Sequence, residues 1–216
     1  MSLRILLVDD HAVVRRGVRS LLESQEGWEV CGEATTGRDA VEQSRRLHPD
    51  IVVMDLTLPE LNGLDATRQI LKDAPDTEVL VLTMHHSEEL ARDVLQAGAR
   101  GYVLKSDADE NLITAVDSLQ RHKPFLTSTV TEFVLGDYVR RGDAAQDDLA
   151  AIAVTTRERE IIQLVAEGRS SKEAASTLGI SVKTIEAHRA NIMRKLRLRS
   201  VSDLVRYAIR NGIVQP

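Results

Sequence analysis

The stretch Ile51-Val52-Val53-Met54-Asp55 contains four consecutive apolar residues followed by a carboxylate. Two other segments have the same form: Ile5-Leu6-Leu7-Val8 precedes the pair Asp9–Asp10, and Gly101-Tyr102-Val103-Leu104 precedes Lys105. Short, nearly continuous apolar runs are typical of parallel strands that are buried on both faces. Ligands of an open α/β sheet bind at the carboxyl ends of its strands. We therefore expect these three carboxylates and one ammonium group to converge on one crevice.

Strands and amphipathic helices alternate five times between residue 3 and about residue 121. The strands are predicted at 3–8, 28–34, 50–55, 78–83 and 101–104. Apolar residues between them follow helical spacing, as in Val14, Val18, Leu21 and Leu22 or in Leu112, Ala115, Val116 and Leu119. This spacing places one face of each helix against the sheet. The pattern predicts an α/β domain with a doubly wound, five-stranded parallel sheet over residues 1–121.

The pattern changes after Lys123-Pro124. Residues 122–151 are predicted to be a linker, with a helix at about 128–141 and a polar run at 141–148. Two capping-box patterns, Thr155-x-x-Glu158 and Ser170-x-x-Glu173, then predict two helix starts. The segment 170–196 has the length and the turn glycine of a helix-turn-helix. A small all-α domain is therefore predicted over residues 152–216.

The formal charge of −5 is unevenly distributed. Residues 151–216 contain 12 Lys and Arg but only 6 Asp and Glu, which is a net charge of +6. The other 150 residues contain 16 bases and 27 acids, a net charge of −11. Such asymmetry indicates two domains with different partners. The basic part suits nucleic acid, whereas the acidic part suits it poorly.

Composition also indicates where the protein works. Cys31 is the single cysteine, so the chain has neither an internal disulfide nor a CxxC metal site. No apolar stretch approaches the roughly 20 residues that a membrane span needs. The segment Met1-Ser2-Leu3-Arg4 leads directly into a strand and lacks the features of an export signal. A cytoplasmic protein without a membrane partner is expected.

The expected crevice suits a divalent cation and a phosphoryl group. Asp9, Asp10 and Asp55 would repel one another unless a positive charge lay between them. Oxygen donors of this kind suit Mg²⁺ or Mn²⁺. Asp10 and Asp55 are the predicted side-chain ligands, the backbone carbonyl of Thr57 is the predicted third ligand, and Asp9 is assigned to the outer shell. Asp55 could then act as a nucleophile on a phosphoryl donor, with Lys105 neutralising charge.

Four segments of the N-terminal part resemble motifs of the receiver domain of bacterial two-component response regulators. They are Val8-Asp9-Asp10-His11, the run from Met54 to Gly63, Leu82-Thr83, and Gly101-Tyr102-Val103-Leu104-Lys105. The resemblance covers about residues 1–121 and implies a flavodoxin-like fold. One difference is Ser106, which follows the lysine where many receivers have proline.

This resemblance implies a role for each charged residue. Asp55 matches the aspartate that accepts phosphate from a sensor histidine kinase, the Asp9–Asp10 pair matches the acidic metal site, and Lys105 matches the phosphate-binding lysine. Thr83 and Tyr102 match the switch residues, whose side chains reorient when phosphate arrives. The Thr83 hydroxyl is suited to this role because it can donate to a phosphoryl oxygen.

Helical geometry predicts a DNA-contacting face on the second helix of the helix-turn-helix. Ile185, Ile192 and Leu196 point to one side of this helix. The predicted contact residues lie on the other faces: Lys183, Thr184, Glu186, Ala187, Ala190, Asn191, Arg194 and Lys195. Five bases between 189 and 199 suit the phosphates of double-stranded DNA.

The C-terminal part resembles the LuxR-type DNA-binding domain over about residues 152–214. The matching segments are 155–160 with Gly168, 171–175 and 184–196, with mild differences at Val154 and within 171–175. In this family the last helix commonly forms dimers, and an apolar stripe is available for that: Val201, Leu204, Val205, Ala208 and Ile209. The alternative, that the stripe packs only within its own domain, stays open.

The two resemblances together predict a response regulator of the NarL/FixJ type. Phosphate at Asp55 would switch DNA binding by the C-terminal domain, and the regulator would form a homodimer when phosphorylated or bound to DNA. It would act as an enzyme only in its own phosphoryl transfer and dephosphorylation. Two alternatives are a regulator that ignores phosphate and an aspartyl-nucleophile phosphatase. The phosphatase is disfavoured because Thr57 stands where its second acid would be.

Overall fold

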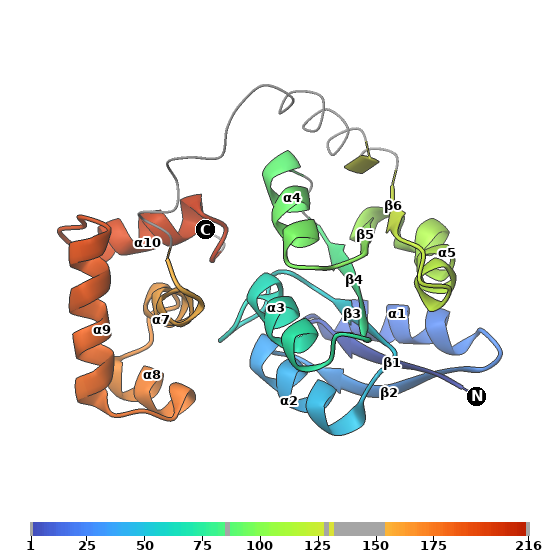
Figure 1. The fold of residues 1–216 in the computed structure, drawn as a ribbon, viewed down its shortest axis with the longest axis horizontal. Coiled ribbons are helices and arrows are strands. Elements are labelled where there is room, and N and C mark those ends of the chain that lie inside the picture. Colours follow the sequence, from blue (N-terminus) through green and yellow to red (C-terminus); the bar gives the residue numbers. More distant parts are fainter. Residues whose placement is uncertain (1, 85–86, 128–129, 132–153, 215–216) are drawn as a thin grey trace. The chain divides into compact units, whose positions relative to one another are not determined.

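The computed structural model describes residues 2–84, 87–127, 130–131 and 154–214, which form two compact units (Figure 1). The helix predicted at about 128–141 lies outside the described residues apart from 130–131. No helix within the described ranges has the length and apolar character needed to cross a membrane.

The first unit contains a parallel sheet with the strand order β2-β1-β3-β4-β5-β6. Its strands are β1 (Leu3–Val8), β2 (Trp28–Ala34), β3 (Ile51–Met54), β4 (Glu78–Thr83), β5 (Gly101–Leu104) and β6 (Phe125–Leu126). The prediction of a parallel α/β sheet is confirmed, but its five strands are corrected to six. The additional strand has only two residues, too few to produce a periodic sequence signal.

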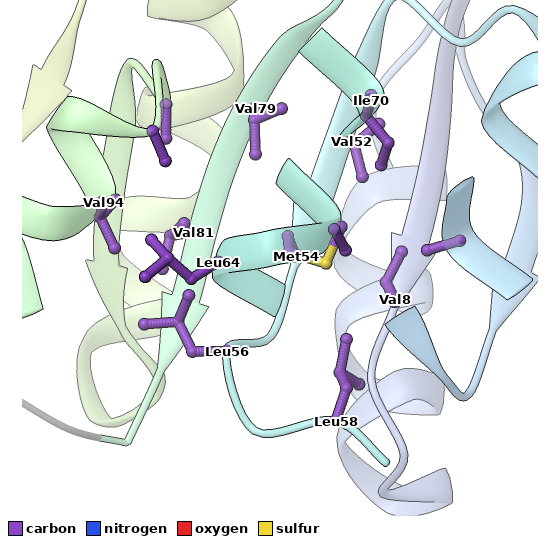
Figure 2. Close-up of a cluster of buried hydrophobic side chains, with 14 of the residues drawn as sticks. Val8, Val52, Met54, Leu56, Leu58, Leu64, Ile70, Val79, Val81 and Val94 are labelled. Carbon is purple, nitrogen blue, oxygen red and sulfur yellow. The ribbon is translucent and has the colours of Figure 1, made fainter. Parts of the chain in front are cut away.

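Helices cover both faces of this sheet (Figure 1). One face packs against α1 (Ala12–Glu23) and α5 (Ala108–Gln120). The other packs against α2 (Gly37–Leu47), α3 (Gly63–Asp73) and α4 (Glu88–Gln96). Figure 2 shows this second core, where strand valines meet Leu64, Ile70 and Val94 from the helices. Because alternate strand residues enter opposite cores, the sheet is buried on both faces.

The carboxyl ends of β1, β3 and β5 bring their following residues to one edge of this sheet. β1 pairs with β3, β3 with β4, and β4 with β5, all in parallel register. The connections after β1 run in opposite directions along the sheet, so β1 and β3 border the switch point at which such sheets bind ligands. A short 3₁₀ turn, Lys105–Asp107, follows β5.

Residues 154–214, the described part of the second unit, form four helices: α7 (Thr156–Ala166), α8 (Ser171–Leu178), α9 (Val182–Lys195) and α10 (Val201–Arg210). Both predicted capping boxes are confirmed, at Thr155 with Glu158 and at Ser170 with Glu173. Gly179 ends α8 with a φ of 64°, a conformation that glycine adopts without steric cost. This residue makes the tight turn between α8 and α9, as the sequence predicts.

Candidate functional site

Three strand ends bring the predicted charged residues together in the first unit. The Nζ atom of Lys105 lies 2.7 Å from Oδ2 of Asp9 and 2.7 Å from Oδ2 of Asp55. The exposed fractions of these side chains are only 2% for Asp9, 3% for Asp55 and 7% for Lys105. One ammonium group thus joins two buried carboxylates that are 46 residues apart in the sequence.

Burial and ion pairing have opposite effects on the pKa values of Asp55 and Lys105. Burial raises the pKa of the Asp55 carboxyl above its ordinary value, although the hydrogen bond and charge of Lys105 lower it. Burial lowers the pKa of Lys105, but the two carboxylates outweigh burial and the net direction is upward. Lys105 therefore stays charged, and Asp55 depends on it for the stability of its own anion.

Asp10 and His11 complete the acidic cluster at its solvent side. His11 Nδ1 lies 2.6 Å from Oδ1 of Asp10, and the His11 backbone N–H donates to Oδ1 of Asp9 at 2.8 Å. One potential ligand atom from each of Asp9, Asp10, His11 and Asp55 lies within 4.8 Å of the others. Three carboxylates at this spacing fit a hard divalent cation such as Mg²⁺. The sequence reasoning assigned no role to His11, although it belongs to the quoted motif.

The loop between β3 and α3 holds Asp55 and Thr57 in place. Oδ1 of Asp55 accepts a hydrogen bond from the Thr57 backbone N–H at 3.3 Å. The Gly63 N–H donates to the Leu56 carbonyl at 2.9 Å. A Cβ atom on Gly63 would lie 1.9 Å from the carbonyl oxygen of Asp55, so only glycine fits there.

The same loop is closed by a buried cap at the start of α3, which the sequence reasoning missed. The Asn62 side chain accepts from the Asp65 N–H at 2.9 Å and donates to Oδ2 of Asp65 at 3.0 Å. Arg68 NH1 adds a bond of 2.7 Å to Oδ1 of Asp65. The available signal was Asn62-Gly63-Leu64-Asp65, which combines a preferred N-cap residue with an acid in the first turn.

The two predicted switch residues lie on the same face of adjacent strands. Thr83 ends β4 opposite Leu104, while Tyr102 pairs with Val81. Both side chains are fully buried, and Tyr102 belongs to the core beneath α2, α3 and α4. Burial raises the pKa of the Tyr102 phenol to about 12. Thr83 thus lies at the carboxyl end of β4, and Tyr102 lies in β5 three residues before Lys105.

In the second unit, α9 separates an apolar face from a polar one, as predicted. Ile185 and Ile192 are buried in the core. Seven of the eight predicted contact residues are exposed: Lys183, Thr184, Glu186, Ala187, Ala190, Asn191 and Arg194. The eighth, Lys195, is partly buried, and its Nζ lies 2.7 Å from Oε2 of Glu158 in the first turn of α7. Lys195 therefore ties the end of α9 to α7.

The apolar stripe of α10 divides into two sets. Leu204 and Ala208 are 2% and 0% exposed and belong to the core of their own unit. Val201 is 47% exposed, and Val205 and Ile209 are partly buried. Packing within the domain therefore accounts for the two most buried residues of the predicted dimer stripe. Val201, Val205 and Ile209, spaced four residues apart, remain accessible.

Comparison with known protein families identifies both units. Residues 5–117 match the family model described as response regulator receiver domain. Residues 153–208 match the model described as bacterial regulatory proteins, luxR family. The first range contains the acidic cluster, and the second contains α7, α8, α9 and most of α10.

Several relatives match this chain over nearly its whole length. Oxygen regulatory protein NreC of Staphylococcus carnosus is 39% identical over 215 residues, which cover 98% of this chain and 99% of that protein. Transcriptional regulatory protein MctR of Rhizobium johnstonii is 35% identical over 213 residues, covering 99% and 96%. RcsB of Salmonella enterica serovar Typhimurium, solved bound to a promoter with a phosphomimetic, has a TM-score of 0.60 at 26% identity and covers 96% of this chain and 98% of that chain. The chain therefore belongs to the response regulators that join a receiver domain to a LuxR-type DNA-binding domain.

Proposed function

We propose that this chain is a transcription regulator of a two-component system, in which a sensor histidine kinase transfers phosphate to Asp55 and thereby controls DNA binding by α9. The observation that carries this proposal is the position of Lys105 between the buried carboxylates of Asp55 and Asp9. A buried aspartate with an adjacent ammonium group and an accessible acidic cluster is suited to accept a phosphoryl group.

In the proposed transfer, a carboxylate oxygen of Asp55 forms the new bond to phosphorus while the donor's leaving group departs with the bonding electron pair. The ammonium group of Lys105 would partly neutralise the charge of the incoming phosphoryl oxygens. Asp10, Asp55 and the carbonyl of Thr57 would hold Mg²⁺ or Mn²⁺, with Asp9 in the outer shell. When bound, the ion would neutralise the charge that develops on the phosphoryl oxygens. Thr83 would donate its hydroxyl hydrogen to one of them. Apart from this transfer, the chain would catalyse only the dephosphorylation of its own Asp55.

The exposed face of α9 is proposed to enter the major groove of double-stranded DNA. Ala187, Ala190, Lys183 and Arg194 are all exposed. The two small side chains would allow close approach, and Lys183 and Arg194 would contact phosphates or bases. A homodimer that uses the accessible stripe Val201, Val205 and Ile209 would present two such helices to half-sites about one DNA turn apart.

The single, partly buried Cys31 suits the reducing cytoplasm, where we place the regulator.

The decisive experiment is labelling of the full chain by acetyl phosphate in the presence of Mg²⁺, followed by measurement of DNA affinity. The wild-type protein should gain one phosphoryl group, and Asp55→Asn should gain none, because the nucleophilic carboxylate is absent. Asp73→Asn, which removes the partner of Arg45 outside the cluster, is the matched control and should be labelled normally. Labelling of Asp55→Asn at the wild-type level would refute the assignment. Equal DNA affinity with and without label would favour a regulator that ignores phosphate.

A further inference from the structure

The sixth strand, β6, attaches the first residues of the predicted linker to the edge of the receiver sheet (Figure 1). Phe125 pairs with Gly101, and Leu126 pairs with Tyr102. The Phe125 N–H donates to the carbonyl of Arg100 at 2.9 Å. The side chains enter opposite cores: Phe125 packs against the cluster beneath α1 and α5, and Leu126 packs against the cluster that contains Tyr102. Backbone and side chains therefore both hold this segment.

Hydrogen bonds hold the segment that precedes β6 at the end of the sheet opposite the acidic cluster. Arg100 donates to Oε1 of Glu78 at 3.0 Å and to the carbonyl of His122 at 2.5 Å. Nδ1 of His122 lies 2.9 Å from the same Glu78 oxygen. His122 has a φ of 55°, which reverses the chain between α5 and β6. The start of β6 is thereby held to the starts of β4 and β5.

The other end of β6 lies beside the strand that leads to the phosphoryl site. Leu126 is paired with Tyr102, and Tyr102 is three residues before Lys105 in the same chain segment. Lys105 in turn contacts Asp55 and Asp9. β5 therefore connects the acidic cluster directly to the linker. A strand of two residues forms few bonds and buries little surface, so it can detach without unfolding the sheet.

We propose that the edge of β5 is a docking site for the segment Phe125–Leu126, and that phosphorylation of Asp55 releases this segment. The proposal rests on the proposed function. A phosphoryl group on Asp55 competes for Lys105, whose Nζ is shared between two carboxylates. Movement of Lys105 shifts the carboxyl end of β5, and this shift weakens the pairing of Tyr102 with Leu126. Release then changes the point at which the chain leaves the receiver sheet, with β6 as the two-state element.

Hydrogen–deuterium exchange of the full chain tests this release. We expect the backbone amides of residues 125–127 to exchange several-fold faster after treatment with acetyl phosphate and Mg²⁺. Asp55→Asn, treated in the same way, should show no change. Unchanged or slower exchange in protein whose Asp55 is labelled would overturn the docking proposal alone. Failure of Asp55 to become labelled, read from the mass of its peptide, would overturn the proposed function and the docking proposal with it.

A pair of variants at one position tests the link to DNA binding. Phe125→Pro removes the N–H that donates to Arg100, whereas Phe125→Leu keeps it and remains apolar. Both should be labelled at Asp55 like the wild type, because neither touches the acidic cluster. On duplex DNA selected by the wild-type protein from a random pool, Phe125→Pro should lose the difference in affinity between phosphorylated and unphosphorylated protein, and Phe125→Leu should retain it. A wild-type difference in Phe125→Pro would overturn the proposal.

Discussion

The proposed phosphoryl site and the proposed DNA-binding face of α9 both contain charged side chains, but the environments of these charges are opposite. Asp9, Asp55 and Lys105 are buried and share two bonds of 2.7 Å. Lys183 and Arg194 lie at the surface of α9. Charges removed from water depend strongly on their partners, whereas exposed charges interact weakly and are screened by salt. Loss of one buried charge should therefore disturb the whole site, while exposed charges should contribute separately.

The largest effect is expected from Lys105→Met, which leaves two buried carboxylates without their shared cation. Breaking a buried ion pair costs roughly 3–5 kcal/mol. We expect a loss of about this size in the free energy of unfolding, measured with urea at pH 7 and a chelator, and no labelling of Asp55. Lys123→Met, which changes an exposed lysine, should stay within about 0.5 kcal/mol of the wild type. Equal stability of the two variants would show that the ion pair is not buried in solution.

Leu204→Ala tests whether the stripe of α10 serves the core or the dimer. Because Leu204 is buried within its own unit, the substitution should destabilise that unit by about 2–5 kcal/mol at any protein concentration. Val201→Ala removes an exposed side chain and should cost about 0.5 kcal/mol or less. Urea unfolding followed by helical circular dichroism measures both. Loss of dimer formation without loss of stability in Leu204→Ala would place this residue at an interface instead.

The pH dependence of stability should have opposite signs for the buried site and for a surface carboxylate. The pKa of Asp55 is raised by burial, so the folded state binds this proton more tightly than the unfolded state does. Without metal, the wild type should lose stability relative to Asp55→Asn as the pH rises from about 4 to 7. The pKa of Glu33 is lowered by hydrogen bonds from Arg15 and Arg19. The wild type should therefore gain stability relative to Glu33→Gln over the same range.

Unfolding of each pair at matched pH values measures both slopes. Slopes of the same sign for Asp55→Asn and Glu33→Gln would contradict the difference in burial between the two carboxylates.

The smallest effects are expected on α9. Arg194→Ala should weaken DNA binding and reduce the slope of log affinity against log salt by about 1, if Arg194 neutralises one phosphate. Lys195→Gln should leave that slope nearly unchanged, because Lys195 is paired with Glu158. Fluorescence anisotropy at several salt concentrations measures both slopes. A full unit lost in Lys195→Gln would restore Lys195 to the set of DNA contacts.

Local patterns predicted most of the secondary structure and of the site. Apolar runs gave strands 3–8, 28–34, 78–83 and 101–104 with the bounds that the structure has. Both capping boxes were predictable because the hydrogen bonds that define each box join residues only three positions apart in the sequence. The convergence of Asp9, Asp55 and Lys105 was predicted because each residue follows a parallel strand, and ligands of such sheets bind at the carboxyl ends of the strands. The roles assigned to Thr83 and Tyr102 came from the family resemblance and remain predictions.

Three features could not be predicted because they depend on neighbours that are distant in the sequence. Lys195 belongs to a basic run, and only folding brings it to Glu158. Leu204 and Val201 lie on one apolar stripe, yet Leu204 is buried in the core of its unit whereas Val201 is exposed. The Asn62–Asp65 cap is a local pattern, but its position beside Asp55 follows from the close approach of Gly63 to the Asp55 carbonyl.

The sequence by itself determined the two domains, the order of the strands along the chain and the charged residues at their ends. These properties follow from periodicity, charge and caps, which act over a few residues. Only the tertiary structure decided that Phe125 and Leu126 join the sheet and that one lysine is shared by two carboxylates. Hydrogen bonds along a sheet edge and the burial of charge depend on which segments meet in space, and no pattern within a single segment contains that information.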